Sequence, residues 1–407
     1  MIEYPGYDRF LCGTFLSFAG NQSLTKQKME LLTNLHRKNI VFQVVVLMVC
    51  TWLMGSQWAC AEDWMGFQLA ENEHVMSYQA NGDILCSALN QEGQLTAIKK
   101  LNHDGEVQWT HNFSEPYVQG TLLFRAIEDE LGFALCGKLG STGQYEAILI
   151  GTDGLVQSRG ILSSSYKLWA MTDTGILFSF PHDEGDEKNT IWYVGWDGKQ
   201  SSGVFSGKIV DVRNTITVGN YVFLNAVYER QDFSRVASIL AMDLETGNLS
   251  NADIGNEGDW SIQSIGKSRE NGIIAVACRS SQREQRVVQI APSGKIQWAT
   301  TLYSDLYGPV AQIVRPCGSD HYEIWGTAGV LDAQEEYPKR FTTYRMELGK
   351  NGELLDSMIG TYSGDCVEYK DTQVYVVDVD ESNYVSLDTF KADSRASKAY
   401  FYATAEE

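Results

Sequence analysis

Beyond residue 62 the chain alternates short apolar runs with turn-forming residues, a pattern typical of β-strands. No segment of this part has the apolar period of an amphipathic helix. Residues 131–139 (LGFALCGKL) and 145–154 (YEAILIGTDG) show the pattern clearly, and a further strand is predicted upstream over 119–127 (QGTLLFRAI). The pattern therefore predicts an all-β domain that occupies residues 62–407.

One turn recurs along this domain at nearly constant spacing. Its glycines follow one another at intervals of 49, 44, 49, 47 and 58 residues, and they are Gly105, Gly154, Gly198, Gly247, Gly294 and Gly352. The residue before each glycine is Asp, Thr, Ser or Asn. Dipeptides such as Asp-Gly and Asn-Gly accept the positive φ of a tight hairpin, so each turn marks a strand–turn–strand unit.

Four strands per repeat of about 45–50 residues predict a β-propeller, because one such antiparallel unit cannot bury its faces alone. Six turns give six blades, and residues 363–391 supply at least three more strands, including 371–379 and 383–390. Either 64–70 or 398–404 completes that last blade. We favour 64–70, because pairing the two ends of the chain removes an exposed sheet edge. The prediction is seven blades, with six and eight as the alternatives.

The repeat resembles the blades of bacterial secreted propellers of the PQQ-like or WD40-like class. LNHDGEVQW and IAPSGKIQW carry the resemblance and end in Trp109 and Trp298. AMDLETGNLSN is similar to the docking motif of PQQ-like blades, with Asn251 where that motif has Trp. The resemblance covers about 64–390 and implies the fold. It implies no chemistry, because propellers host many functions.

Residues 36–61 have the organisation of a signal peptide. A basic segment at 36–38 precedes an apolar stretch over 40–54, and Ala59-Cys60-Ala61 supplies a cleavage site of the A-x-A type. As a helix the apolar stretch spans about 22 Å, less than the ~30 Å hydrocarbon core of a bilayer. We therefore expect a secreted or extracytoplasmic protein, with an uncleaved N-terminal anchor as the alternative. Residues 1–61 form the N-terminal extension and signal helix, and Met29 is a candidate for the true start.

The charge of the chain restricts its partners. The formal net charge is −20, and residues 1–61 carry +2 of it, which leaves −22 on the predicted propeller. A domain of that charge repels phosphate backbones and anionic lipid surfaces. Nucleic acid is excluded as a partner on this ground, and membrane contact is expected only if the apolar segment is uncleaved.

Two acidic segments raise the question of calcium, which prefers several oxygen ligands from one short loop. The first contains Asp183, Glu184 and Asp186, and the second contains Asp378 and Asp380 in a D-x-D-x-S pattern. The second segment lacks the loop glycine and the terminal Glu of a calcium loop. Both segments are more typical of solvated hairpin tips. No cofactor is predicted, and calcium is left open.

The sequence contains few residues typical of quinone, histidine-metal or disulfide sites. Quinoprotein dehydrogenases use adjacent cysteines, which this chain lacks, and its histidines show no metal-ligand spacing. The predicted mature chain keeps five cysteines. Cys86, Cys136 and Cys278 occupy equivalent places in second strands and are expected to be buried thiols, whereas Cys317 and Cys366 are the pair to test for a disulfide.

The aromatic residues divide into two groups. Trp109 and Trp298 stand at expected blade-packing positions. Five less regular tryptophans are candidates for loops or the axial mouth: Trp169, Trp192, Trp196, Trp260 and Trp325.

Two functions follow from these observations. The first is a non-catalytic recognition or scaffold module that binds a protein, peptide or glycan at its loop face. The alternative is an extracellular polysaccharide hydrolase or lyase whose carboxylates come from different blades and converge at the axis. The sequence names no catalytic residue for the alternative, so recognition is the preferred hypothesis.

Overall fold

The computed structural model describes residues 65–78, 83–102, 104–118, 121–127, 132–179, 189–279, 283–330, 338, 340–361, 364–369, 373–380, 382–393 and 401–403. The chain divides into Met1–Glu62 and Asp63–Glu407, and the description concerns the second unit. The predicted signal segment over 36–61 and the candidate start at Met29 lie outside the described residues. Among the residues described, no helix has both the length and the apolar character needed to span a bilayer.

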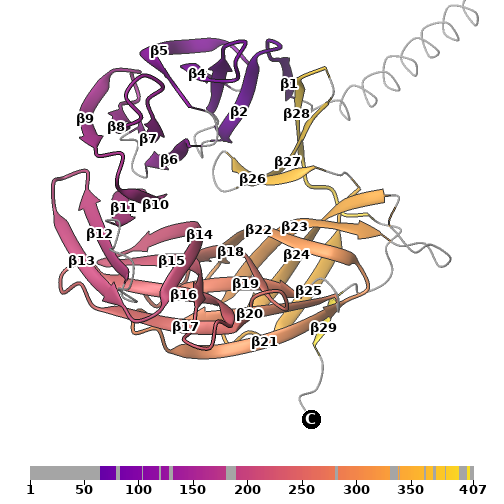
Figure 1. The fold of residues 1–407 in the computed structure, drawn as a ribbon. Helices are drawn as coiled ribbons and strands as arrows, with labels where there is room; N and C mark the ends of the chain where they lie inside the picture. Colours follow the sequence, from indigo (N-terminus) through magenta and orange to yellow (C-terminus); the bar gives the residue numbers. More distant parts are fainter. Residues whose placement is uncertain are drawn as a thin grey trace, which may run out of the picture. The chain divides into compact units, whose positions relative to one another are not determined.

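The described strands form seven sheets that surround a common centre (Figure 1). We number the sheets as blades 1 to 7 in chain order. Blades 1 to 3 comprise β2 (Glu73–Tyr78), β3 (Ile84–Leu89), β4 (Leu95–Leu101) and β5 (Val107–Tyr117); β6 (Leu123–Ile127), β7 (Gly132–Lys138), β8 (Tyr145–Ile150) and β9 (Val156–Leu162); and β10 (Lys167–Met171), β11 (Gly175–Ser179), β12 (Asn189–Gly195) and β13 (Gln200–Phe205).

The remaining blades continue the same order. They comprise β14 (Lys208–Val218), β15 (Tyr221–Glu229), β16 (Arg235–Asp243) and β17 (Leu249–Asn256); β18 (Ser261–Lys267), β19 (Ile273–Arg279), β20 (Glu284–Ile290), β21 (Ile296–Ser304) and β29 (Phe401–Ala403); β22 (Tyr307–Cys317), β23 (His321–Val330), β24 (Arg340–Gly349) and β25 (Leu354–Ile359); and β26 (Asp365–Tyr369), β27 (Gln373–Val379), β28 (Tyr384–Thr389) and β1 (Met65–Gln68). The prediction of a seven-bladed propeller with mostly four-stranded blades is confirmed.

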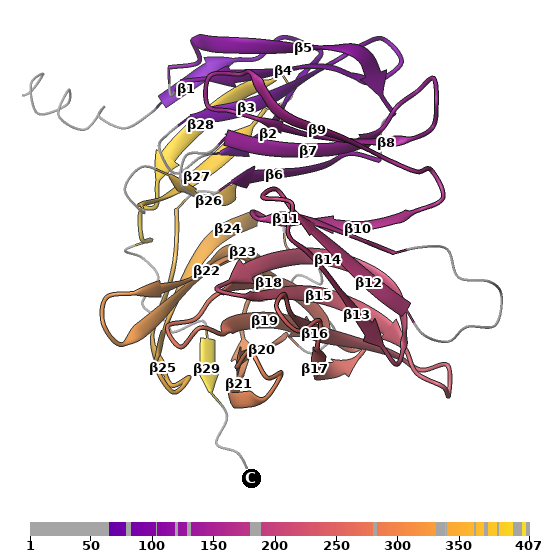
Figure 2. The same cartoon turned by 90° about the vertical axis from the view of Figure 1, so that its left-hand side faces the viewer.

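Blade 7 closes the ring with strands from both ends of the domain. β1 pairs antiparallel with β28, with Phe67 opposite Val385 and Met65 opposite Leu387. Figures 1 and 2 show β1 beside β28, although more than three hundred residues separate them in the sequence. The preference for 64–70 as the closing strand is thereby confirmed. The rival segment contributes β29, which becomes a fifth strand of blade 5.

The recurring turn joins the third and fourth strands of blades 1 to 6. The six glycines of these turns all have positive φ, between 73° and 88°, a conformation that glycine adopts without steric cost. Blade 7 has no such turn, because its third strand (β28) and its fourth strand (β1) come from opposite ends of the domain. The count of six turns for seven blades follows from this closure.

Five of the six turns, all but the one at Gly198, also lie against the blade before them. A Cβ at Gly154 would lie 2.7 Å from the indole of Trp109, and a Cβ at Gly352 would lie 2.5 Å from the indole of Trp298. Trp109 Nε1 donates a hydrogen bond to the carbonyl of Thr152 at 2.8 Å. The prediction that Trp109 and Trp298 pack between blades is therefore confirmed.

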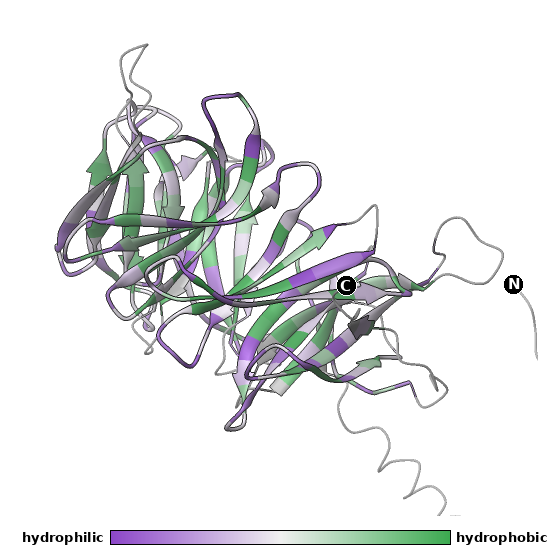
Figure 3. Cartoon of the chain, turned by 90° about the horizontal axis from the view of Figure 1, so that it is seen from below, coloured by the Kyte–Doolittle hydropathy of each residue, from purple (hydrophilic) through white to green (hydrophobic). Residues whose placement is uncertain are grey.

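The core lies between the blades, on the second and third strands. All seven interior residues of β15 are buried, whereas most of β9, an outer strand, is exposed. Figure 3 shows apolar residues concentrated along the strands and polar residues in the turns. A middle strand is covered by the neighbouring blade on each face, so it is apolar throughout, whereas an outer strand meets water.

Candidate functional site

A groove of about 600 Å³ runs along the outer part of blade 5. β21 supplies Ala299, Thr300, Thr301 and Tyr303 to it, and the turn between β24 and β25 supplies residues 351–353. The remaining lining residues belong to the inner part of blade 5: Arg279 at the end of β19, Glu284 and Arg286 on β20, and Trp260 directly before β18. We call these four residues the blade 5 cluster.

Two arginines of the blade 5 cluster lie over one indole. The guanidinium of Arg286 lies 4.5 Å from the centroid of the Trp260 ring, and that of Arg279 lies 5.9 Å from it. Trp260 is only 8% exposed, so the arginines and not the indole meet solvent in the groove. Guanidinium groups are stabilised over the negative face of an aromatic ring. The groove lining thereby holds two guanidinium groups beside two carboxylates, those of Glu284 and Glu353.

The hydrogen bonding of the two arginines is incomplete. Arg286 donates to the backbone carbonyl of Ile254 at 2.9 Å, a neutral acceptor. Arg279 Nη1 lies 3.5 Å from Glu284 Oε2, at the limit of a hydrogen bond, while Arg279 Nε is buried without a partner among the described residues. A buried donor without an acceptor costs free energy. The terminal guanidinium N–H groups, and not this buried Nε, are the ones that a carboxylate in the groove could bind.

Glu284 is the carboxylate of this cluster, and it is 7% exposed. It pairs across strands with Arg279 on one side and with Tyr303 on the other. A hydrogen bond to Glu284 raises the pKa of Tyr303, because the neighbouring carboxylate disfavours the phenolate. The oxygens of Glu284 are thus already used within the blade.

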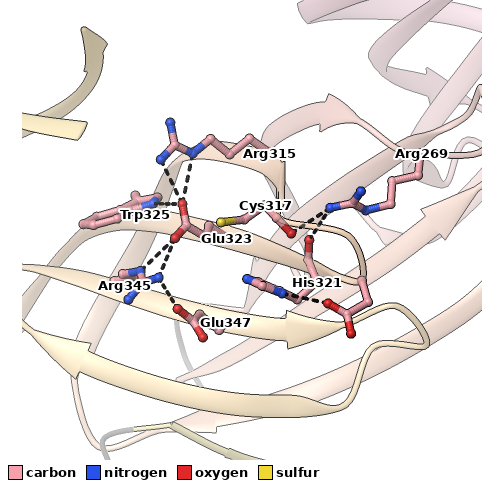
Figure 4. A network of polar contacts seen from close by, with 9 residues as sticks. Arg269, Arg315, Cys317, His321, Glu323, Trp325, Arg345 and Glu347 are labelled. Carbon is pink, nitrogen blue, oxygen red and sulfur yellow. Dashed lines mark hydrogen bonds and ion pairs between the residues drawn. The ribbon is translucent and has the colours of Figure 1, made fainter. Parts of the chain in front are cut away.

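Blade 6 carries a second cluster of similar composition, formed by Arg315, Glu323, Trp325 and Arg345 (Figure 4). Here both arginines bind one carboxylate. Arg315 Nε and Nη2 lie 3.0 and 2.9 Å from Glu323 Oε2, and Arg345 Nε lies 3.1 Å from Glu323 Oε1. Trp325 Nε1 donates to Glu323 Oε2 at 3.2 Å, and Arg345 also pairs with Glu347. We call the first four residues the blade 6 cluster.

The environment of Glu323 determines its charge. Burial by itself would raise its pKa, but hydrogen bonds from Arg345, Arg315 and Trp325 outweigh burial and lower the pKa from 4.5 to about 2. Glu323 is therefore a carboxylate at neutral pH, saturated by its donors. Trp325 packs edge-to-face against Phe390 of blade 7, with ring centroids 4.9 Å apart. The cluster therefore contributes to packing between blades 6 and 7, and both carboxylate oxygens of Glu323 already accept hydrogen bonds.

The candidate calcium ligands divide between described and undescribed residues. Asp183, Glu184 and Asp186 lie outside the described residues. Asp380 Oδ1 accepts hydrogen bonds from the backbone N–H and the hydroxyl of Ser382, at 2.8 and 2.6 Å, and therefore stabilises its own hairpin turn. Asp378 lies on β27, opposite Ser386 of β28. Within the described part of the chain, no three His, Cys, Asp or Glu side chains are grouped so that they could hold a metal ion.

The five described cysteines are free thiols. Cys86, Cys136 and Cys278 are buried on β3, β7 and β19, the second strands of their blades, as predicted. Burial raises the pKa of Cys136 and of Cys366 to about 12, so both remain protonated at neutral pH. Cys366 is a weak donor to the carbonyl of Gly326 at 3.6 Å and forms no bridge to Cys317.

The sequence indicated part of the groove but not its arrangement. Trp260 and Trp325 were among the tryptophans expected at loops or the mouth; Trp260 lines the groove, whereas Trp325 is buried between blades. Arg279, Glu284 and Arg286 were not singled out. The segment R-x-x-x-x-E-x-R from 279 to 286 would have been the available signal, because a hairpin brings its arginines to one face.

Comparison with known proteins gives similarity at the level of fold. No family model matches the chain, and no curated protein matches it. Prolyl oligopeptidase B from Galerina marginata is similar with a TM-score of 0.48 and 10% identity, over 81% of this chain and 50% of that chain. The chain thus spans about half the length of that structure.

Two further solved structures are shorter. The β-propeller domain of the trilobed protease from Pyrococcus furiosus has a TM-score of 0.47 and 8% identity, over 79% of this chain and 97% of that one. A protein of unknown function from Bacteroides caccae has a TM-score of 0.30 and 11% identity, over 68% and 93%. The chain is a seven-bladed β-propeller by its own sheet topology, and these similarities concern that fold alone.

Proposed function

We propose that this chain is an exported, non-catalytic β-propeller that recognises a peptide, protein or carbohydrate ligand through the groove on blade 5. The two arginines of the groove lining, Arg279 and Arg286, carry the proposal, because Arg286 has only a neutral backbone acceptor and Arg279 only one long contact with a carboxylate. A ligand that brings a carboxylate or another strong acceptor would form charge-assisted hydrogen bonds with these guanidinium groups. Recognition sites commonly place a few polar groups in a groove in this way.

The non-catalytic part of the proposal rests on the acidic groups of the groove. Glu284 is engaged by Arg279 and Tyr303. The carboxylate of Glu353 accepts a hydrogen bond from the N–H of Asn351, within its own turn. General acid–base catalysis of glycoside cleavage needs two carboxylates that face the substrate. Neither group is placed for that role.

The proposal also includes export of the protein and a resemblance of its blades to PQQ-like repeats. The basic, apolar and A-x-A succession over 36–61 supports delivery outside the cytoplasm by a cleaved signal. The contact of Trp109, near the start of the outer strand β5, with the turn of the next blade supports the resemblance to PQQ-like repeats. N-terminal sequencing of the protein recovered from an extracytoplasmic fraction would begin at Glu62, and a start upstream of residue 40 would reject cleavage.

Array binding tests the recognition role directly. The full chain is applied to peptide and glycan arrays, beside Arg286→Gln and the matched control Arg213→Gln, an exposed arginine of blade 4 outside the groove lining. We expect acidic ligands to lose about tenfold in affinity with Arg286→Gln, because one charge-assisted hydrogen bond is worth about that factor. The control should bind as wild type. Equal binding by all three proteins, or turnover of a bound ligand, would contradict the proposal.

A further inference from the structure

We infer that Phe233, at the tip of the hairpin between β15 and β16 of blade 4, anchors a second interface, in which its phenyl ring enters an apolar pocket of a partner protein. Residues 229–235, which form the end of this hairpin, do not line the groove on blade 5, so this interface is separate from the proposed function. Three features carry the inference: the exposure of the ring, the backbone conformation of Phe233 and the bracing of the hairpin.

The ring of Phe233 makes little use of the fold. At 81% it is the most exposed large apolar side chain among the described residues. Because so little of it is buried, hydrophobic burial gives the folded chain little stability at this position. A single exposed apolar residue is common on protein surfaces, so the exposure alone does not indicate a binding site. The backbone of Phe233 supplies the further observation.

Phe233 has a φ of 64°, in the left-handed region. Its N–H donates to the carbonyl of Arg230 at 3.0 Å, and the N–H of Arg230 donates to the carbonyl of Ser234 at 2.9 Å. The corresponding turns of blades 1 and 7 have the same arrangement. There Gly93 and Asn383, both with positive φ, donate the equivalent hydrogen bond, also at 3.0 Å. One turn geometry thus carries glycine, asparagine and phenylalanine at the same position in three blades.

Phenylalanine is the costly choice among these three residues. Glycine has no Cβ and adopts a positive φ freely, and asparagine also visits this region. In other L-residues the Cβ lies too close to the following carbonyl oxygen, which costs the fold free energy. Backbone outliers of this kind are concentrated at binding and functional sites. A costly conformation that presents an exposed ring to solvent is therefore explained by binding and not by stability.

The hairpin holds the ring in a fixed place. β15 ends at Glu229 and β16 begins at Arg235, directly opposite it, so only residues 230–234 extend beyond the paired strands. Arg230 Nη2 lies 2.7 Å from Asp253 Oδ2 on the neighbouring strand β17. An exposed ion pair contributes little stability by itself, but it ties the base of the turn to the blade. A side chain that is already positioned loses less conformational entropy when it binds.

The charge around the tip favours a protein as the partner. Residues 229–235 contain two arginines and two acidic residues, which sum to zero, within a predicted propeller of −22. A domain of that charge repels an anionic lipid surface and also a second copy of itself. One isolated ring gains affinity when a pocket encloses it, as aromatic residues do at the centre of protein interfaces, and the charged residues beside it suit the polar rim.

Stability measurements test whether the ring serves the fold. Phe233→Gly installs the residue of the blade 1 turn, and Phe233→Asn installs that of the blade 7 turn. We expect the melting midpoint of the full chain to rise by about 1–2 °C with Phe233→Gly, because the backbone strain is relieved and little burial is lost. Phe233→Asn should not lower the midpoint. Calorimetry follows both, and a lower midpoint for the two variants would show that the ring supports the fold and would overturn the inference.

Binding measurements test the partner. The full chain is immobilised and exposed to the extracytoplasmic fraction, and a retained protein is identified, purified and titrated against the variants. We expect its Kd to rise at least about tenfold with Phe233→Gly and with Phe233→Asn, because the pocket loses its apolar occupant. Phe233→Leu, which stays apolar, should bind within about fivefold. The matched control is Phe341→Asn, which removes another exposed ring, on β24 of blade 6, and should bind as wild type.

Three outcomes would overturn the inference and leave the groove on blade 5 untouched. The first is that no purified partner distinguishes wild type from Phe233→Gly. The second is flotation with vesicles of phosphatidylcholine and phosphatidylglycerol that depends on Phe233, which would make the occupant a lipid surface. The third is self-association in sedimentation velocity that Phe233→Gly abolishes, which would make the occupant a second copy. The effect of Arg286→Gln on the arrays reports on the groove alone, so failure of one interface does not imply failure of the other.

Discussion

The blade 5 and blade 6 clusters contain the same kinds of residue and differ in what the fold leaves unsatisfied. Each has a glutamate, two arginines and a tryptophan. In blade 6 both arginines bind Glu323, whereas in blade 5 only Arg279 approaches Glu284, and Arg286 donates to a backbone carbonyl instead. We call the blade 6 cluster closed, because its carboxylate binds both arginines, and the blade 5 cluster open, because its carboxylate contacts only one. The residue composition alone does not distinguish the two.

The position of the glutamate in its sheet explains the difference. Glu323 lies on β23, whose neighbours β22 and β24 place Arg315 directly opposite it and Arg345 two residues further along. Glu284 is the first residue of β20, where its neighbours are Arg279 and Tyr303. One carboxylate thus receives two guanidinium groups and the other receives one. The comparison teaches that strand register, and not residue type, decides how many guanidinium groups such a cluster brings to its carboxylate.

The largest expected effect comes from breaking the closed cluster. Glu323→Gln removes the carboxylate while it keeps the shape, and it leaves two largely buried guanidinium groups without their shared anion. We expect the free energy of unfolding to fall by about 3 kcal/mol, as for other broken buried pairs. Urea denaturation at pH 7 measures it. A loss below about 1 kcal/mol would show that the blade 6 cluster is as weakly coupled as a surface pair.

At acidic pH the difference in unfolding free energy between wild type and Glu323→Gln should become smaller. The pKa of Glu323 is about 2 in the folded chain, against an ordinary value of 4.5 for a glutamate carboxyl. Its stabilising contribution is therefore present above pH 4.5 and is lost as the pH falls toward 2. We expect the gap in unfolding free energy between wild type and Glu323→Gln, up to about 3 kcal/mol, to narrow across this window. A gap of constant size from about pH 6 to about pH 2.5 would contradict the assigned ionisation.

A smaller effect is expected from the open cluster. Glu284→Gln weakens the long contact with Arg279 but keeps an amide oxygen that can accept from Tyr303, so the free energy of unfolding should fall by only about 1 kcal/mol. The same change leaves the groove one unit more positive, and the affinity for acidic ligands found on the arrays should rise about threefold, the effect of a weak ion pair. Urea denaturation and fluorescence titration follow the two quantities. If the loss of stability matched that of Glu323→Gln, the two clusters would be equivalent and the comparison would fail.

Particular residues show how far the sequence could carry the prediction. The turn glycines, such as Gly105 and Gly154, gave the blade count because positive φ restricts these positions to few residue types. Cys86, Cys136 and Cys278 were predicted as buried thiols because equivalent strand positions have equivalent surroundings. The acidic segments were less informative. The carboxylate of Asp380 accepts a hydrogen bond within its own turn. The spacing of carboxylates in a sequence cannot reveal this, because spacing contains no information on hydrogen-bond geometry.

Local patterns by themselves determined the all-β class, the four-stranded repeat and the closing role of residues 65–68, because each depends on neighbours close in sequence or on the need to cover an edge. Tertiary structure alone decided three other features: β29 joins blade 5, Glu323 is saturated, and the groove exposes the arginine pair. All three depend on contacts between blades or on register across strands. A shift of register by one residue turns a side chain to the opposite face. The middle strands are buried on both faces, so they lack the alternation of apolar and polar residues that would specify this choice.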